Sequence, residues 1–378
     1  MRVAIAHDFI RHGGAERVLE QMHRLWPDAP VYTLLDERNP MTADWDVRPS
    51  RLQGLVPPSR YRWPLPFYPG MVDRLRVEPD IDLLVTSSVS WMKSLRAPPG
   101  VPHLCYIYRP MMFAYERQAE FLAGYPAPVR PFLRLLIRRI RRWDQARADV
   151  PDLYVACSRY IAEAVRRHYR REAEVLYPPV RLGPFLEAGR RRPPGDYFLT
   201  AARLESYKRI DVAVAACSRL GLPLKVAGRG PQLGELRRLA GPTVEFLGFV
   251  PDRELPELMA GCRALLFPSE EDFGIAPVEA MAAGRPVIAF ARGGPAETVE
   301  DGVSGLHFPA QTADALIEAL RRFERLEFDP ERIRAGTAGF SEQAFRDGLA
   351  ELAARLVAQG PRGHNGSGQA AAATGGPL

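Results

Sequence analysis

The chain has 378 residues, of which 46% are hydrophobic and 25% charged, and it carries a formal net charge of +6. This composition excludes a disordered, collagenous or disulfide-bonded scaffold, and the length predicts two domains. No apolar run is long enough to span a bilayer, and the apolar stretch at the N-terminus is too short for a signal peptide, so we expect a cytoplasmic protein. The mild basic excess suits phosphate ligands or the anionic inner face of a membrane, and we expect no nucleic-acid partner.

Short apolar runs alternate with amphipathic stretches of helix length along most of the chain. This alternation predicts parallel sheets with crossover helices, and therefore an α/β fold. We expect two series of strands, at 3–6, 31–35, 83–87, 103–108, 153–157 and 174–177, and then at 197–201, 224–227, 244–247, 264–267 and 287–290. Two such sheets in tandem place a cleft between their carboxyl edges, where open α/β folds bind ligands.

The stretch between the two series contains two PP pairs, a further proline and a run of three arginines. Such a composition cannot continue a helix or a central strand, so it predicts a linker. Near the C-terminus we expect a long helix that packs back toward the first domain, and then a Gly/Ala/Ser-rich disordered tail. The predicted boundaries are 1–180 for the N-terminal domain, 181–195 for the linker, 196–340 for the C-terminal domain, 341–358 for the helix and 359–378 for the tail.

Residues 268–289, PSEEDFGIAPVEAMAAGRPVIA, form the most informative string. Gly274 lets a ligand approach the backbone, and Pro277 suits the first turn of a helix whose free N–H groups attract anions. Glu271 in the loop and Glu279 early in that helix direct two carboxylates at one small volume, where they can accept hydrogen bonds from vicinal hydroxyls. Taken singly, Glu279 fits a complement to the helix dipole equally well, and Glu271 fits a solvated position.

A second string, TAARLESYKRID at 200–211, follows the first strand of the second domain. Arg203 and Lys208 on its loop are two cations that can neutralise a diphosphate and stabilise the charge that develops on it as a leaving group. A solvated surface pair is the alternative. It fits Arg203, one of many arginines, better than Lys208, one of three lysines.

Glycines mark two further loops. In HDFIRHGGAERV at 7–18, Gly13 and Gly14 allow N–H groups to approach a phosphate or a sugar, although an ordinary strand-to-helix turn has the same pattern. In VAGRGPQLGEL, Gly228 is not followed by the third glycine of a dinucleotide fingerprint, because Leu233 stands in its place. This spacing disfavours a nicotinamide-dependent dehydrogenase.

The sequence predicts no metal site. Asp80 and Asp82 form a DxD that is typical of the lead into a buried strand, with no third ligand in view. No HExxH or i,i+4 histidine pair indicates zinc. The four cysteines lie far apart beside apolar neighbours and are interpreted as reduced and buried. We expect neither a metal nor a cofactor besides the substrate.

Residues 130–147, RPFLRLLIRRIRRWDQAR, predict an amphipathic helix. Its two faces are Leu133, Leu136, Ile137, Ile140 and Trp143 on one side, and Arg130, Arg134, Arg138, Arg141 and Arg142 on the other. Such a helix can lie on an anionic membrane. More often it packs on its own domain and leaves a solvated basic face.

Together these strings resemble glycosyltransferase family 4, the retaining, sugar-nucleotide-dependent transferases of the GT-B fold. The resemblance covers residues 1 to about 355 and implies two Rossmann-like α/β/α domains that face each other across a cleft. It is carried by RLESYKRID (203–211), GRGP (228–231), FLGFVPDREL (246–255), EDFGIAPVE (271–279) and GGPAETVEDGVSGL (293–306), with ACSRYIAEAV and VLYPPV before the linker.

The resemblance implies that Arg203 and Lys208 bind the donor diphosphate, that Glu279 accepts the ribose hydroxyls, and that Glu271 with the backbone of 273–275 holds the transferred sugar. It also implies a metal-independent reaction with retention, in which the departing phosphate takes the acceptor proton and no protein nucleophile is needed. The implied catalytic residues are Glu271, Arg203 and Lys208. The implied donor-binding residues are Arg203, Lys208, Gly228, Val250, Glu271, Phe273, Gly274, Ile275 and Glu279. The implied acceptor or phosphate loop contains Gly13, Gly14 and Tyr108.

The segment CYIYRPMMFAYE at 105–116 departs from the family pattern YxHTPxRxxW, because Tyr108, Met112 and Tyr115 occupy the His, Arg and Trp places. Relatives with this segment include GDP-mannose-dependent mannosyltransferases of surface polysaccharides. Our first expectation is therefore mannose transfer from GDP-mannose to a glycan or a polyprenyl-type lipid-linked acceptor, with a peripheral membrane contact through Arg130 to Arg147. The alternatives are a nucleotide-sugar epimerase of the same architecture and an inactive partner protein of the same fold.

Overall fold

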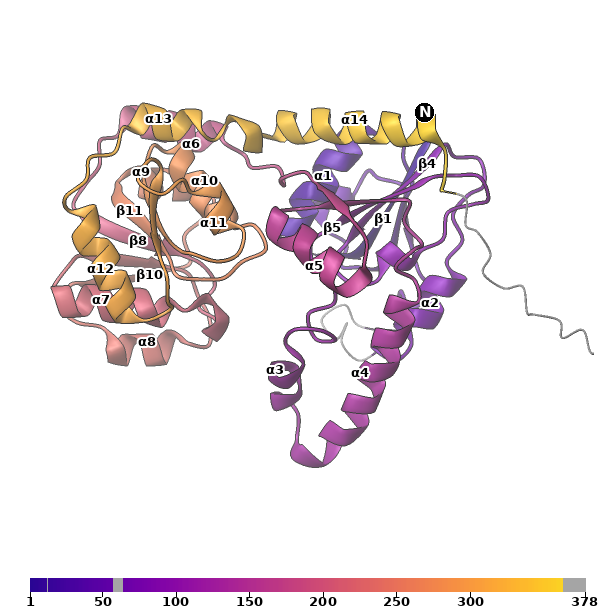
Figure 1. Ribbon diagram of the computed structural model, residues 1–378, viewed down its shortest axis with the longest axis horizontal. Coiled ribbons are helices and arrows are strands. Elements are labelled where there is room, and N and C mark those ends of the chain that lie inside the picture. Colours follow the sequence, from indigo (N-terminus) through magenta and orange to yellow (C-terminus); the bar gives the residue numbers. More distant parts are fainter. Residues whose placement is uncertain (12, 57–63, 363–378) are drawn as a thin grey trace, which may run out of the picture.

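The computed structural model describes residues 1–11, 13–56 and 64–362. This part of the chain contains two parallel sheets, each packed with helices, one from the N-terminal and one from the C-terminal half (Figure 1). The architecture is therefore the two-domain α/β fold that the strand pattern predicts.

Within the described residues, the N-terminal sheet has seven parallel strands in the order β3-β2-β1-β4-β5-β6-β7. Central β1 is almost wholly buried, which agrees with its apolar sequence and with helices covering both faces. The strands are β1 (Val3–Ile10), β2 (Val31–Asp36), β3 (Val47–Pro49), β4 (Leu83–Ser88), β5 (His103–Ile107), β6 (Leu153–Ala156) and β7 (Ala173–Val175). The helices are α1 (Gly14–Leu25), α2 (Tyr68–Arg74), α3 (Gln118–Ala123), α4 (Arg130–Gln145) and α5 (Arg159–Tyr169), with short 3-10 turns η1 (Pro40–Thr42), η3 (Met92–Ser94) and η4 (Ala127–Val129).

The C-terminal sheet has six described strands, all parallel, in the order β10-β9-β8-β11-β12-β13. They are β8 (Tyr197–Ala201), β9 (Leu224–Ala227), β10 (Val244–Gly248), β11 (Cys262–Phe267), β12 (Val287–Phe290) and β13 (Gly305–Phe308). The helices are α7 (Ile210–Leu220), α8 (Leu233–Leu239), α9 (Leu255–Ala260), α10 (Ile275–Ala282), α11 (Pro295–Thr298), α12 (Ala313–Phe323) and α13 (Pro330–Ala335), with 3-10 turns η5 (Ser206–Lys208) and η6 (Ala338–Phe340). The edge strands β3 and β13 are absent from the sequence prediction.

The segment predicted as an irregular linker contains a helix, α6 (Gly183–Arg191), so that part of the prediction is wrong. Pro184 lies in the first turn, where its missing N–H costs no intrahelical hydrogen bond. Phe185 and Ala188 are buried in the core of the C-terminal domain and tie the helix to it. The proline pairs therefore flank the helix without interrupting it.

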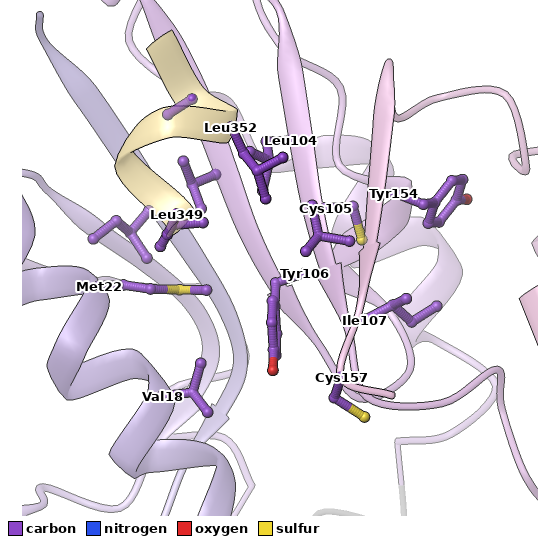
Figure 2. Packing of buried hydrophobic residues seen from close by; sticks show 14 of the residues in the cluster. Val18, Met22, Leu104, Cys105, Tyr106, Ile107, Tyr154, Cys157, Leu349 and Leu352 are labelled. Carbon is purple, nitrogen blue, oxygen red and sulfur yellow. The ribbon is translucent and has the colours of Figure 1, made fainter. Parts of the chain in front are cut away.

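The last helix, α14 (Glu342–Gln359), returns to the N-terminal domain (Figure 1). Ser341 caps it, because the side-chain oxygen accepts a hydrogen bond from the N–H of Ala344 at 3.1 Å. Leu349 and Leu352 pack beside Met22 of α1 and Tyr106 of β5 in one core cluster (Figure 2). The helix extends one residue into the predicted disordered tail, and residues 360–362 are also described. The remainder of that tail, 363–378, lies outside the described residues.

Helix α4 projects with α3 from the N-terminal domain (Figure 1). Ile137 and Ile140 are buried in the core of that domain, and Leu133, Leu136 and Trp143 pack against the same cluster. The apolar face recognised in the sequence therefore lies on the protein itself and is not available to a membrane.

Candidate active site

The strand orders locate the places where ligands bind in folds of this kind. In each sheet the chain adds strands to one side of the first strand and then crosses back to its other side, so β1 lies between β2 and β4, and β8 lies between β9 and β11. The loops after such strands diverge and leave a crevice at the carboxyl edge. The glycine loop follows β1, while the RLESYK and EEDFG loops follow β8 and β11.

A cavity of about 380 Å³ lies between these loops and takes its walls from both domains. Seven of the residues predicted for the site line it, namely Gly14, Tyr108, Lys208, Glu271, Phe273, Gly274 and Ile275. Its other wall residues are Ala15, Val18, Cys157, Pro178, Ala201, Ala202, Phe267, Asp272 and Ala276. The structure thus brings together the glycine loop of one domain and the acidic loop of the other.

Lys208 and Glu271 form an ion pair in this cavity, and their side chains are only 16% and 21% exposed. Lys208 lies in η5, directly after the loop that follows β8. Arg203, from the same loop, is exposed and donates to the hydroxyl of Tyr207 at 2.8 Å, so its guanidinium is not part of the cavity wall. The cavity thus holds, side by side, a cation and a carboxylate that can accept hydrogen bonds.

The start of α10 shapes the floor of the cavity. Gly274 has φ +85°, a conformation that favours glycine, and a Cβ there would lie 2.9 Å from Cγ of Pro295. Pro277 occupies the first turn of the helix, as predicted for a terminus whose N–H groups point outward. Phe273 and Ile275, on either side of Gly274, both line the cavity.

Glu279 is buried in α10 and lies outside the cavity wall. Burial raises the pKa of its carboxyl, while the guanidinium of Arg17 acts in the opposite direction. Arg17 reaches across from α1 and lies 3.3 Å from Glu279 and 3.4 Å from Asp252. The carboxylate predicted to hold a ribose is thus paired with a cation from the other domain.

The remaining predicted residues, Gly13, Gly228 and Val250, do not line the cavity. Gly13 has an extended backbone with φ −174°. Gly228 has φ +143°, and a Cβ there would collide with the carbonyl oxygen of Ala202, so this glycine permits close packing of two loops. Val250 is half-buried against the core of the C-terminal domain.

Tyr108 ends a chain of buried hydrogen bonds that enters the cavity. Its hydroxyl donates to the carbonyl of Ala15 at 3.1 Å and lies 2.9 Å from Oγ of Ser87, which is 2.9 Å from Nδ1 of His7. Because Tyr108 gives its proton to Ala15, Ser87 donates to Tyr108 and accepts from His7. Burial raises the pKa of Tyr108 and lowers that of His7 to about 4, so both stay neutral near pH 7. The departure from the family pattern therefore supplies a fixed neutral hydroxyl.

The two other departures from that pattern do not join the cavity. Met112 is 36% exposed. The hydroxyl of Tyr115 donates to Asp144 at 2.7 Å within the N-terminal domain. All four cysteines are free and buried, as predicted, and burial raises the pKa of the Cys157 thiol at the cavity wall. A thiol with a raised pKa is a poor nucleophile.

Sequence reasoning missed a set of contacts that bridge the two domains behind the cavity. Arg109, directly after Tyr108, is buried and pairs with Asp272 at 2.5 Å. Burial raises the pKa of Asp272 to about 6, and Arg109 counteracts that rise. The carboxylate of Glu297 accepts hydrogen bonds from two backbone N–H groups at the start of α5, at 2.9 and 3.1 Å. Arg109, Asp272 and Glu297 all lie inside strings discussed above, but nothing in those strings indicates that they face residues of the other domain.

In the part of the chain that the structure describes, no three His, Cys, Asp or Glu side chains gather in a group that could hold a metal ion. Both DxD aspartates instead contact Arg2. The carboxylate of Asp80 pairs with its guanidinium, and the carboxylate of Asp82 accepts a hydrogen bond from its backbone N–H at 2.7 Å. Among the described helices, none combines the length and apolar character needed to cross a membrane.

Two family descriptions match the chain in succession, "Glycosyltransferase Family 4" at residues 12–183 and "Glycosyl transferases group 1" at residues 187–340. O-antigen chain mannosyltransferase C of Escherichia coli is 34% identical over 34% of this chain and 38% of its own length. Alpha-1,3/1,6-mannosyltransferase ALG2 of Mus musculus is 27% identical over 67% of this chain and 68% of its own length. In three bacterial relatives the matched segment spans less than half of the relative, 44%, 38% and 29%.

Among solved structures, Anabaena Alr3699/HepE in complex with UDP aligns with a TM-score of 0.70 over 94% of this chain and 100% of that chain. Its sequence is 18% identical, so this likeness bears on the fold alone. The chain belongs to the glycosyltransferases: it carries a family 4 domain followed by a group 1 domain, on the GT-B fold.

Proposed function

We propose that this chain is a retaining glycosyltransferase that moves a sugar from a nucleotide-diphosphate donor to a glycan or lipid-linked acceptor, without a metal. The observation that carries the proposal is the Lys208–Glu271 pair in a cavity that both domains line. A cation and a hydroxyl acceptor side by side match the two parts of a nucleotide sugar that meet at the bond to be broken.

In the proposed complex, the diphosphate lies against Lys208 and the first turn of α10, while Glu271 accepts hydroxyls of the sugar. As the glycosidic bond breaks, negative charge grows on the phosphate, and the fixed ammonium and helix N–H groups stabilise it. The departing phosphate takes the proton of the acceptor hydroxyl. Glu279 holds the ribose once Arg17 leaves it, and Arg203 turns inward from Tyr207 toward the diphosphate.

The acceptor enters from the N-terminal domain, along Gly14 and Tyr108. A Cβ at Gly14 would lie 3.6 Å from Cδ1 of Ile275 in the opposite domain, an ordinary van der Waals contact, so the glycine loop and the start of α10 lie close together at the cavity. The neutral hydroxyl of Tyr108, held by Ser87 and Ala15, is suited to hydrogen-bond a sugar hydroxyl without adding a charge.

Mannose is the proposed sugar and GDP-mannose the proposed donor. Support comes from relatives named as mannosyltransferases, O-antigen chain mannosyltransferase C and ALG2. A likeness to a structure solved with UDP makes UDP-sugars the first competitors to include.

Thermal unfolding against saturating GDP-, UDP-, ADP- and dTDP-sugars tests donor binding. A ligand at about 100 times its dissociation constant adds ~2.7 kcal/mol to the stability of the folded chain, a shift of roughly 2–4 °C. We expect a shift with GDP-mannose that Lys208→Ala abolishes and that Lys225→Ala leaves intact, because Lys225 lies on β9 beside Glu245 and outside the cavity. A shift with no donor would contradict the proposal, and a shift with UDP-sugars alone would overturn the choice of donor.

A further inference from the structure

Three large apolar side chains stand exposed within seven residues, where α4 begins. Phe132 is 66% exposed and Leu135 is 65% exposed, and Val129 in the preceding turn is 42% exposed. The beginning of α4, which carries them with the preceding turn η4, forms the tip of the α3–α4 projection (Figure 1). The opposite face of α4 already packs on the domain through Ile137 and Ile140. These exposed side chains are therefore not the core face of the helix.

The exposed face continues along the helix as a basic stripe. Arg138, Arg139 and Arg142 lie three, four and seven residues after Leu135, so they share its side of α4 and are exposed. Among the described residues, no carboxylate pairs with Arg134, Arg138, Arg139 or Arg142, whereas Arg147 pairs with Asp73 near the far end. We call Phe132, Leu135, Arg138, Arg139 and Arg142 the outward stripe.

Charge is concentrated in this projection. Residues 118–147 contain seven arginines and two acids, a net charge of +5 against +6 for the whole chain. Both acids are engaged elsewhere, since Asp144 is buried beside Lys93 at 3.0 Å and Glu120 lies 3.7 Å from Arg117. The outward stripe therefore presents cations that nothing on its own element neutralises.

We infer that the outward stripe docks the protein on an anionic lipid bilayer. Aromatic and aliphatic side chains at one end and guanidinium groups along the rest suit a helix that inserts its first turn among the headgroups while its arginines meet lipid phosphates. A purely acidic protein surface would match the charge of the arginines, but it would offer no apolar contact for Phe132 and Leu135. The inference rests on the proposed function in one respect: a lipid-linked acceptor makes such a surface useful.

Sedimentation with vesicles tests this inference without donor or acceptor. Wild-type protein is expected to bind phosphatidylcholine vesicles that contain phosphatidylglycerol, to bind pure phosphatidylcholine weakly, and to be released by salt. Each arginine near an anionic surface contributes about fivefold, so Arg138→Gln with Arg142→Gln is expected to weaken binding about 25-fold. Phe132→Ser with Leu135→Ser is expected to weaken it at least about tenfold, because less apolar surface leaves water.

The matched control removes two exposed arginines and one exposed leucine from α8 of the other domain, Arg237→Gln, Arg238→Gln and Leu239→Ser. It should bind vesicles as the wild type does. The inference would be overturned if the control lost vesicle binding equally, or if the wild type did not bind anionic vesicles. It would also be overturned if Phe132→Ser with Leu135→Ser kept full vesicle binding, because the stripe would then be a general polyanion surface.

All the changed side chains are exposed, so the variants should keep the wild-type thermal unfolding and its donor-induced shift. Vesicle binding without any donor-induced shift would count against the proposed function and leave the membrane inference standing. A donor-induced shift without vesicle binding would support the proposed function and overturn the membrane inference.

Discussion

Gly274, the residue before α10, shows how strictly the backbone of the site is determined. Its φ of +85° costs a residue with a side chain ~1–2 kcal/mol. A Cβ would also lie 2.9 Å from Cγ of Pro295, which forces one of the two to move, and such overpacking costs ~1–3 kcal/mol. We therefore expect Gly274→Ala to lower the free energy of unfolding by ~2–5 kcal/mol in total.

Gly302→Ala is the matched control, because its φ is +79° and no atom lies within 4 Å of the added Cβ. It should cost only the backbone component, ~1–2 kcal/mol. Urea unfolding of both variants gives the two losses, and thermal unfolding with the donor gives their affinities. Only Gly274→Ala should also weaken donor binding, because its backbone lines the cavity. Equal destabilisation of the two variants, or full donor affinity in Gly274→Ala, would refute this reasoning.

Three further outcomes follow from single contacts. Leu349→Ala, at a fully buried position of α14, should cost ~2–5 kcal/mol in urea unfolding, and a loss below about 1 kcal/mol would contradict the packing of that helix on the N-terminal domain. Burial lowers the pKa of His103 to about 3, so the unfolded chain binds more protons below pH 6.5; stability should fall by ~2 kcal/mol between pH 6.5 and 5 from this group, and His103→Gln should show a correspondingly flatter pH profile. Arg17→Gln removes the cation that opposes the raised pKa of Glu279, so this carboxylate should take up a proton at a higher pH than in the wild type. As the pH is lowered, donor affinity should therefore be lost earlier in the variant, and an unshifted pH profile of donor affinity would argue against this pairing.

Much of the fold follows from the sequence because hydrophobic periodicity is local. The predicted strands at 197–201 and 287–290 have the bounds that the structure shows for β8 and β12. The edge strands β3, with the sequence VRP, and β13, with the sequence GLHF, give no such signal, because neither contains a continuous apolar run. Helix α6 was missed because Pro184 was treated as a helix breaker, whereas its position in the first turn makes it harmless.

The same distinction between local and long-range information applies to the site. Lys208, Glu271 and Gly274 lie in continuous strings with a chemical meaning of their own, and the structure gathers them in one cavity. The bridging contacts join residues that are far apart in the chain, 262 positions for Arg17 and Glu279, so only the packing of the two domains reveals them. Likewise, the exposure of Phe132 depends on which face of α4 the domain covers, which periodicity alone does not decide.

Product analysis tests the central claim most directly. The chain is incubated with GDP-mannose and with UDP-sugars, together with glycan and polyprenyl-linked acceptors, and both the nucleoside diphosphate and the new glycoside are measured. We expect one donor to yield a glycoside with retained anomeric configuration, a rate roughly 10²–10³-fold lower in Lys208→Ala, and a rate within about twofold of wild type in Lys225→Ala. No glycoside from any donor, or equal rates in the two lysine variants, would contradict the assignment of catalysis to the Lys208–Glu271 cavity.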